Sequence, residues 1–347
     1  MNYYECYTFD DLQIVPAYSE IESRTDCDTS TRIVDNVKLK IPILSSPMDT
    51  VTEFEMVKEL HRLGCAGVLH RFMNFHDLER QVRNIDIDPI IVSIGAHFKP
   101  IEFKLLYQEG VRVFLIDVAH GHSIHVKRTL KEIKSQYDDV KVIAGSIATA
   151  QAAKDLLRWG ADGIRVGVGN GSLCETRIRT GVGVPQATAI EGVSQIIDLY
   201  ENETGKRPSL IADGGIKTPG DVAKAIALGA DVVMLGSLLA GTKESPGRLI
   251  RVGQFPDEQL FKLYRGSASQ SAKVDRGEGD NHIEGNSKQI PYKGKVERIV
   301  RNIQDGLSSA MSYVGAKDLK EFREKVTFIK VTNAGQIEAQ PHLLMKG

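Results

Sequence analysis

The chain has 347 residues, and its 44 Lys and Arg residues nearly balance its 45 Asp and Glu residues, which leaves a net charge of −1. No basic excess points to a nucleic acid or a membrane surface, and no apolar run reaches the roughly 18 residues of a membrane span. The N-terminus lacks the basic region and apolar core of a signal peptide. The four cysteines fit neither a zinc site nor a disulfide framework, so we expect a reduced, cytoplasmic protein.

Eight short apolar runs rich in Val and Ile predict strands that are buried on both faces. They are residues 41–48, 66–71, 89–97, 111–120, 141–149, 163–170, 209–216 and 232–241. Helical patterns lie between them, for example at 53–64, 150–160 and 218–229. Alternation over eight units predicts a single α/β domain, a (β/α)8 TIM barrel. A doubly wound open sheet is the alternative, and the lack of a GxGxxG motif after the first strand weighs against it.

Two segments fall outside this repeat. Residues 266–295 are polar, charged and rich in glycine, which predicts a long mobile loop that serves as an active-site flap; a plain disordered insertion is the alternative. Residues 296–315 return to helical periodicity, and residues 326–347 form a C-terminal extension with a short strand and a tail.

Polar and glycine-rich residues follow several predicted strands, at Asp117–His120, Gly167–Gly171, Asp213–Gly215 and Gly236–Ser237. In a barrel these strand ends form one rim, which carries the active site. Asp213 could accept the two hydroxyls of a ribose, while the glycines after the last two strands offer bare amides to a phosphate. Tight turns that need glycine are the alternative for both motifs.

One cysteine stands in the segment GVGNGSLCETRIRTGVGVPQ (167–186), among five glycines. Cys174 could become a nucleophilic thiolate there, because loop amides and Arg177 can supply a positive environment. The glycines permit backbone angles that turn carbonyls inward to bind a monovalent cation. For Cys6, Cys27 and Cys65 we favour the alternative role of a small buried hydrophobe.

Two further features are less specific. Asp117, at a strand end, could hold a ribose or an amide of a second ligand, and the nearby His120 and His122 lack the carboxylate spacing of a metal site, so we expect hydrogen-bonded or surface histidines. Glu284 lies in the predicted flap and matters only if the flap brings it to a bound base.

Together these motifs resemble the IMP dehydrogenase/GMP reductase family over nearly the whole chain. The matching stretches are TFDDLQIVPAYSEI (8–21), SSPMDTVTE (45–53), IDVAHGHS (116–123), GNGSLCETRIRTGVGVPQ (169–186), ADGGI (212–216), GSLLAG (236–241), LYRGSAS (263–269), IEGNSKQIPYKG (283–294) and GLSSAMSYVGA (306–316). Their order and combination are highly specific.

The resemblance implies that Cys174 bonds covalently to purine C2 and that Thr176 and Glu284 relay protons beside it. The positions that it assigns to the nucleotide are Ser46, Met48, Ser172, Asp213, Gly215, Gly236, Ser237, Tyr264, Gly266 and Ser267. Those that it assigns to the nicotinamide cofactor are Asp117, Ala119, His120 and Gly121. A potassium ion would be held by carbonyls of Gly167, Gly169 and Cys174, with Glu338, Ala339 and Gln340 from a neighbouring subunit. A homotetramer is also implied.

Two reactions occur in this family. A reductase converts GMP and NADPH into IMP and ammonia, whereas a dehydrogenase converts IMP, NAD and water into XMP and NADH. Residues 81–95 run straight through without the regulatory CBS pair of most dehydrogenases, and the short flap contains Arg276 but no adjacent tyrosine to activate water. MDTVTE (48–53) and VTNAGQIEAQPH (331–342) look like a dehydrogenase instead. We weigh the flap more heavily and expect a GMP reductase, with IMP dehydrogenase as the alternative.

Some positions depart from both patterns. Asn170 replaces the usual proline, Glu175 the usual threonine and Ser146 the usual asparagine, and Ser267-Ala268 replaces the Met-Gly pair that contacts the base in dehydrogenases. A carboxylate at position 175 would oppose thiolate formation if it pointed toward the thiol. These departures leave room for a non-standard purine nucleotide, or for a regulatory protein that binds nucleotides without turnover.

Overall fold

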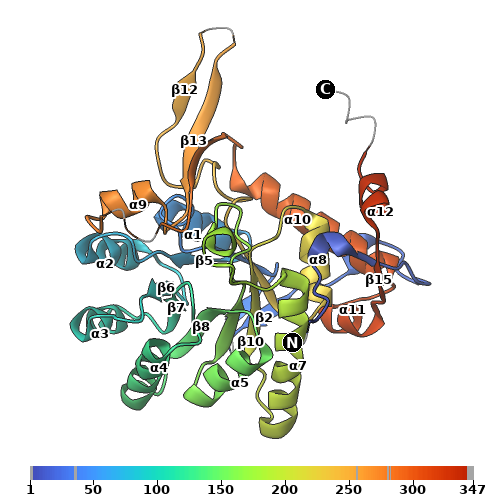
Figure 1. The fold of residues 1–347 in the computed structure, drawn as a ribbon, viewed down its shortest axis with the longest axis horizontal. Helices are drawn as coiled ribbons and strands as arrows, with labels where there is room; N and C mark the ends of the chain where they lie inside the picture. The colour runs from blue at the N-terminus through green and yellow to red at the C-terminus, as the bar shows by residue number, and fades with distance from the viewer. Residues whose placement is uncertain (1–2, 35–36, 255–256, 280, 282, 342–347) are drawn as a thin grey trace.

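A closed, parallel, eight-stranded barrel ringed by helices forms the body of the protein (Figure 1). The computed structural model describes residues 3–34, 37–254, 257–279, 281 and 283–341. The strands run around the barrel in the order β10, β11, β4, β5, β6, β7, β8 and β9, and β9 pairs with β10 to close it. The predicted (β/α)8 barrel is confirmed, and the open sheet is excluded.

All eight predicted strands form. They are β4 (Ile43–Ser45), β5 (Ala66–Leu69), β6 (Ile91–Ile94), β7 (Val113–Asp117), β8 (Lys141–Ile147), β9 (Gly163–Val166), β10 (Ser209–Asp213) and β11 (Val232–Leu235). The surrounding helices are α1 (Phe54–Arg62), α2 (Phe75–Asn84), α3 (Pro100–Gln108), α4 (Ile124–Gln136), α5 (Ala150–Trp159), α7 (Gln186–Thr204), α8 (Pro219–Ala227) and α10 (Val296–Tyr313). A short helix, α6 (Thr176–Thr180), precedes α7.

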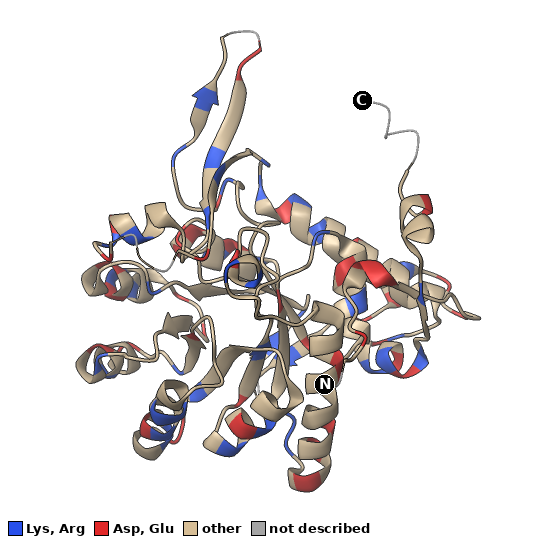
Figure 2. Cartoon of the chain, in the orientation of Figure 1, with Lys and Arg blue, Asp and Glu red and all other residues tan. Residues whose placement is uncertain are grey.

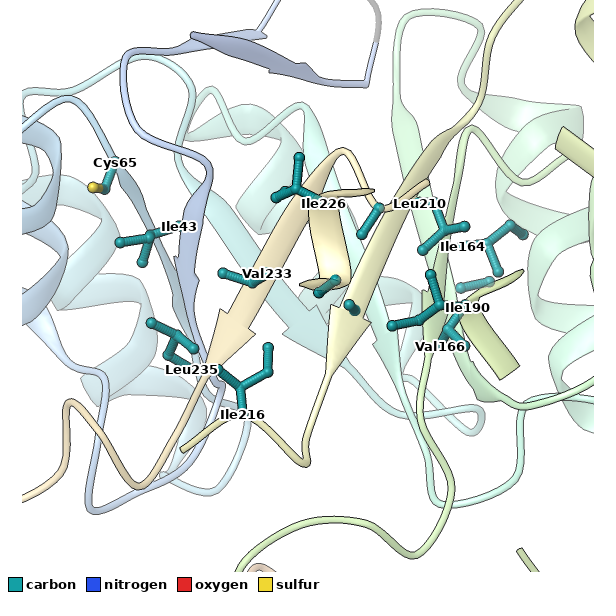
Figure 3. Close-up of a cluster of buried hydrophobic side chains, with 14 of the residues drawn as sticks. Ile43, Cys65, Ile164, Val166, Ile190, Leu210, Ile216, Ile226, Val233 and Leu235 are labelled. Carbon is teal, nitrogen blue, oxygen red and sulfur yellow. The ribbon is translucent and has the colours of Figure 1, made fainter. Parts of the chain in front are cut away.

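The strands lack polar alternation because both of their faces are buried. On β7, Val113 and Leu115 belong to the cluster inside the barrel, whereas Phe114 and Ile116 belong to the cluster between strands and helices. Figure 3 shows part of the outer cluster, where Ile164 of β9 and Leu210 of β10 lie near Ile190 of α7. Burial of this kind is worth roughly 25 cal/mol per Å2 of apolar surface and makes the barrel a packed core.

A hairpin closes the amino-terminal end of the barrel. Strands β2 (Thr31–Ile33) and β3 (Val37–Leu39) pair antiparallel, and Ile33, Val34 and Leu39 pack in the inner cluster. The amide of Val34 also donates to Ser209 Oγ (2.8 Å) at the start of β10. Ligands therefore have access to the barrel from the opposite, carboxyl-terminal end.

The segment between β11 and α10 departs from the prediction of a long loop at 266–295. It contains α9 (Gln270–Asp275) and β14 (Ser287–Pro291), and β14 pairs antiparallel with β13 (Gln259–Arg265). Strand β12 (Ile250–Val252) completes this sheet, and the β12–β13 hairpin projects away from the barrel (Figure 1). The expectation of an irregular loop was wrong for α9 and β14, because β14 is almost wholly exposed and is held by backbone hydrogen bonds, which composition does not reveal. The role of residues 266–295 as a flap stays a prediction, and we keep the name flap for them.

The C-terminal extension lies along the N-terminal segment. Strand β15 (Phe328–Lys330) pairs with β1 (Leu12–Ile14), which follows the short helix η1 (Phe9–Asp11). Residues predicted as a tail form α12 (Asn333–Glu338), and the end of that predicted tail, 342–347, lies outside the described residues. The remaining short elements are η2 (Arg24–Asp26) and α11 (Leu319–Lys325).

Positions of Lys and Arg alternate with positions of Asp and Glu along the outer helices (Figure 2). No helix in the described part of the chain is both long enough and apolar enough to cross a membrane.

Candidate active site

A pocket of about 710 Å3 opens at the carboxyl ends of the barrel strands, between the strand-following loops and the flap. It brings together most residues that the sequence assigned to a site. They are Ser46, Met48, Asp117, Ala119, Gly167, Gly169, Ser172, Cys174, Thr176, Asp213, Gly215, Gly236, Ser237, Tyr264, Gly266, Ser267 and Glu284. The rim on which the sequence placed these motifs therefore encloses a single cavity.

Other predicted residues lie elsewhere. His120 and Gly121 do not line the pocket, and Gly121 is buried with its amide donating to the carbonyl of Ser146 (2.7 Å). Neither do Glu338, Ala339 and Gln340, at the end of α12, which packs near η1. The sequence assigned these last three to the site of a neighbouring subunit, so that role stays a prediction.

Cys174 begins a chain of hydrogen bonds that crosses from the cysteine loop to the flap. Its thiol donates to Thr176 Oγ1 (3.2 Å), and that hydroxyl donates to Glu284 Oε2 (2.7 Å). A proton can therefore pass between the sulfur and the carboxylate through one hydroxyl group. The sequence predicted these three residues as a group, and the fold supplies the contact between positions far apart in the chain.

Arg177 has a different role from the one expected. Its guanidinium donates to the carbonyls of Val168 and Val184 rather than to the thiol, so it holds the two ends of the cysteine loop together. The fold explains Asn170 in a similar way, because its amide donates to Gln186 Oε1. Gln186 is buried and donates in turn to the carbonyl of Val166 (2.9 Å), which fixes the loop to β9.

Gly167 allows the closest approach in this loop. Its φ is 150°, and a Cβ atom there would lie 1.9 Å from the carbonyl oxygen of Asp213. Only glycine fits between the two strand ends at this point. The ends of β9 and β10 are therefore held together, and with them the cysteine loop and Asp213.

Arg165 links the two acidic residues of the rim. It is 5% exposed, and its Nη2 donates to Asp117 Oδ1 (2.7 Å) while its Nη1 lies 3.7 Å from Asp213 Oδ2. Burial raises the pKa of Asp213 to about 6, Arg165 opposes that rise, and the charge on Asp117 adds to it. Arg165 was not predicted from the sequence, although an arginine inside the apolar run of β9 is a signal for a buried charge.

Tyr264 faces the residues that were assigned to the phosphate. Its hydroxyl lies 3.1 Å from Ser172 Oγ, and burial raises the pKa of the phenol. A Cβ atom on Gly236 would lie 3.2 Å from Tyr264 Oη and 3.4 Å from both Met48 Sδ and Ser46 Oγ. A glycine at 236 therefore keeps open a space that hydroxyl groups and backbone amides surround, which suits an anion.

A second arginine cluster at the mouth was not predicted. Two guanidinium groups contact the ring of Phe72, with Arg71 4.5 Å and Arg276 4.6 Å from its centre. Arg276 donates to both oxygens of Glu278 (2.7 and 2.9 Å) and to the carbonyl of Ser267 (2.9 Å). Positions 72 and 276 meet only in the folded chain, so no local pattern could have found them.

Within the described part of the chain, no cluster of His, Cys, Asp or Glu side chains could hold a metal ion. His122 instead pairs with Asp155 (3.0 Å) and stacks on Trp159, which agrees with the expected hydrogen-bonded histidine. A potassium site made of backbone carbonyls is a separate matter. Gly169, with a φ of 77°, has a conformation that favours glycine, which is compatible with such a site.

The fold and this pocket define a (β/α)8-barrel protein whose strand-end pocket is lined by a cysteine loop, two acidic residues and several glycines. The model of the IMP dehydrogenase / GMP reductase domain matches residues 6–342, and the chain belongs to this family. Its members are oxidoreductases that act on IMP or GMP with a nicotinamide cofactor.

Curated relatives carry both names. The chain is 38% identical to the inosine-5'-monophosphate dehydrogenase of Cryptosporidium parvum, over 96% of this chain and 94% of the relative. It is 36% identical to the GMP reductase of Streptococcus agalactiae, over 94% of this chain and 96% of the relative. The inosine-5'-monophosphate dehydrogenase of Borreliella burgdorferi is 33% identical, with 97% of both chains covered.

Proposed function

We propose that this protein is a GMP reductase that forms a covalent adduct between Cys174 and purine C2. The observation that carries the proposal is the hydrogen-bonded chain from Cys174 through Thr176 to Glu284. Glu284 takes the thiol proton through the Thr176 hydroxyl as sulfur attacks C2. The same path returns a proton to the amino group, which leaves as ammonia.

The nucleotide would lie across the pocket from Tyr264 to the cysteine. Asp213 accepts hydrogen bonds from the ribose hydroxyls, while Ser172, Tyr264, Ser237 and the amides of Gly215 and Gly236 hold the 5'-phosphate. The base lies beside a further group of pocket residues, namely Ser46, Met48, Gly266 and Ser267. This placement puts purine C2 near Cys174.

The cofactor would lie on the side of the same cavity that Asp117 and Ala119 line. Because Arg165 fixes the Asp117 carboxylate, this group is oriented to accept hydrogen bonds from a riboside. NADPH, when bound, would supply the hydride that reduces the adduct at C2, and Cys174 would then leave as the thiolate to give IMP. We also propose that the carbonyls of Gly167, Gly169 and Cys174 hold a potassium ion. We further propose that the protein assembles as a homotetramer.

The surroundings of Arg276 favour the reductase over the dehydrogenase. A dehydrogenase must activate water to cleave its adduct, whereas here Arg276 is paired with Glu278, stacked on Phe72 and followed by glycine. IMP dehydrogenase remains the second candidate. Two observations favour this second candidate. Arg276 Nη1 is buried and has no hydrogen-bond partner among the described residues, and two of the relatives named above are inosine-5'-monophosphate dehydrogenases.

Incubation with GMP and NADPH, and separately with IMP and NAD in potassium buffer, tests the direction through the nicotinamide absorbance. We expect NADPH loss with GMP. NADH formation from IMP would replace the reductase with the second candidate. A Cys174 adduct with a reactive purine analogue, without any cofactor oxidation, would indicate a regulatory nucleotide-binding protein instead.

A further inference from the structure

The flap reaches the cysteine loop through a short antiparallel contact. The amide of Glu175 donates to the carbonyl of Glu284 (2.9 Å), and the amide of Asn286 donates to the carbonyl of Leu173 (3.0 Å). Between these two bonds, Cys174 and Gly285 face each other as an isolated bridge. The flap therefore contacts the loop next to the nucleophile itself.

The same flap residues pair on their other side with the chain that follows β13. The amide of Gly266 donates to the carbonyl of Asn286 (2.9 Å), and the amide of Glu284 donates to the carbonyl of Ala268 (3.2 Å). A Cβ atom on Gly285 would lie 3.4 Å from the amide nitrogen of Ser269 and 3.5 Å from the carbonyl oxygen of Leu173. Residues 284–286 are thus inserted between two segments, and their register decides where the Glu284 side chain goes.

One side chain on the cysteine loop contacts the flap beside these backbone bonds. Glu175 Oε1 accepts a hydrogen bond from Asn286 Nδ2 (2.5 Å), and Glu175 Oε2 accepts from Nε (3.0 Å) and Nη2 (2.9 Å) of Arg179. Both carboxylate oxygens are engaged. Arg179 lies on the short helix α6, and its own side chain is 57% exposed, so it orients Glu175 without contributing much stability.

The spacing of these residues couples this contact to the proton path. Residues two apart on an extended segment point to the same face, so Glu284 and Asn286 face the cysteine loop together. Thr176 bonds Glu284, and its neighbour Glu175 bonds Asn286. A slip of the flap by one residue would turn Glu284 away from Thr176.

We propose that Glu175 is a positioning residue that acts through Asn286 to hold Glu284 within reach of Thr176. This inference rests on the proposed function, because it assigns Glu175 to the register of the same proton path. The thiol of Cys174 bonds Thr176, whereas the Glu175 carboxylate bonds Asn286 and Arg179, so the carboxylate that departs from the family pattern has a defined contact in this chain.

Steady-state kinetics of Glu175→Ala, Asn286→Ala and the double variant test the proposal. Each single change lowers kcat about tenfold and leaves the KM for the nucleotide unchanged, because the ribose and phosphate contacts stay intact. The double variant is no slower than either single variant, since both remove the same contact. Glu175→Gln keeps an acceptor for Asn286 and recovers part of the rate. Arg301→Ala, which breaks an exposed ion pair on α10, is the matched control and leaves kcat unchanged.

Hydrogen exchange at the amides of Glu175 and Asn286 reads the same contact without turnover. In Asn286→Ala we expect exchange at Glu175 to be about tenfold faster, which corresponds to on the order of 1.4 kcal/mol. Unchanged exchange, or additive losses in kcat, would overturn the proposal. If the wild-type protein turned over neither GMP nor IMP, the proposed function would fail, while exchange would still decide whether Glu175 fixes the flap.

Discussion

The pocket is lined by two groups of residues that differ in how they are held. The strand side consists of residues on β7, β9 and β10, namely Asp117, Arg165 and Asp213. The loop side consists of Cys174 and Thr176 on the cysteine loop and Glu284 on the flap. The first group is a set of charges packed into the barrel, so its geometry is fixed when the barrel closes. The second is a chain of neutral and charged groups whose contact depends on a few backbone bonds of the flap.

Because of this difference, we expect substitutions on the strand side to reduce folding stability and substitutions on the loop side to reduce turnover. Breaking a buried ion pair leaves an uncompensated charge and should reduce folding stability. Altering the loop side should leave the barrel folded and reduce turnover, because those groups contribute little to the core. Substitutions on each side therefore test whether stability and turnover depend on different groups.

The largest effect is expected at the nucleophile. Cys174→Ala should lower turnover by at least about 10^3-fold, because no other group in the pocket can form the adduct. Its thermal midpoint should stay close to that of the wild type, since Cys174 lies on a loop and is only half buried. Steady-state rates and calorimetry measure the two. Cys6→Ala, at an exposed position, serves as the control, and turnover by Cys174→Ala above a tenth of the wild-type rate would rule out the covalent mechanism.

The next effect falls on the strand side and on stability. Arg165→Met should lower the free energy of unfolding by about 3–5 kcal/mol, because Asp117 and Asp213 lose their shared counterion. Urea unfolding measures it. Arg80→Ala breaks an exposed pair with Asp77 and should change the same quantity by less than about 1 kcal/mol. Equal losses in the two variants would mean that the rim charges are not effectively buried.

A smaller effect should follow pH through Asp213. Its pKa of about 6 predicts that nucleotide affinity falls about tenfold from pH 8 to pH 5, as the carboxylate that accepts the ribose hydroxyls becomes protonated. Titration calorimetry with GMP measures this loss. Asp213→Asn should bind weakly with no such dependence, and a wild-type affinity that is constant over this range would contradict the assignment.

The same shift has the opposite consequence for folding. The pKa of Asp213 is raised from 3.8 to about 6, so the folded state binds more protons than the unfolded chain between these values. The stabilising contribution is therefore complete below pH 4 and is lost as the pH rises through 6. Unfolding of the wild type and Asp213→Asn, compared over pH 4–7, should show that this loss disappears in the variant.

The smallest effect is expected at Arg179, on the exposed edge of the loop side. Arg179→Ala removes one of the two groups that orient the Glu175 carboxylate, and it should lower kcat about twofold, because an exposed ion pair is worth less than about 1 kcal/mol. Steady-state kinetics measure the change. Arg179→Lys should behave like the wild type, and an unchanged kcat in Arg179→Ala would show that Arg179 does not orient Glu175.

Sequence alone determined the barrel and the composition of its rim. Val- and Ile-rich runs that alternate with amphipathic helices leave few other folds. Asp117 and Asp213 stand at strand ends in the sequence, and Cys174 lies on the glycine-rich loop that follows another strand. The order of the family motifs then identified the family, because each motif is local and can be recognised without knowing its neighbours in space.

Tertiary structure decided which of these residues act on one another. Arg165 joins two acids from other strands, Phe72 meets Arg276 of the flap, and Glu175 bonds Asn286 rather than facing the thiol. Strand β14 also depends on tertiary structure, because it is held by backbone hydrogen bonds to β13 and has no apolar pattern of its own. Local periodicity is set by neighbours along the chain, whereas these contacts exist only after the barrel closes and the flap lies against its rim.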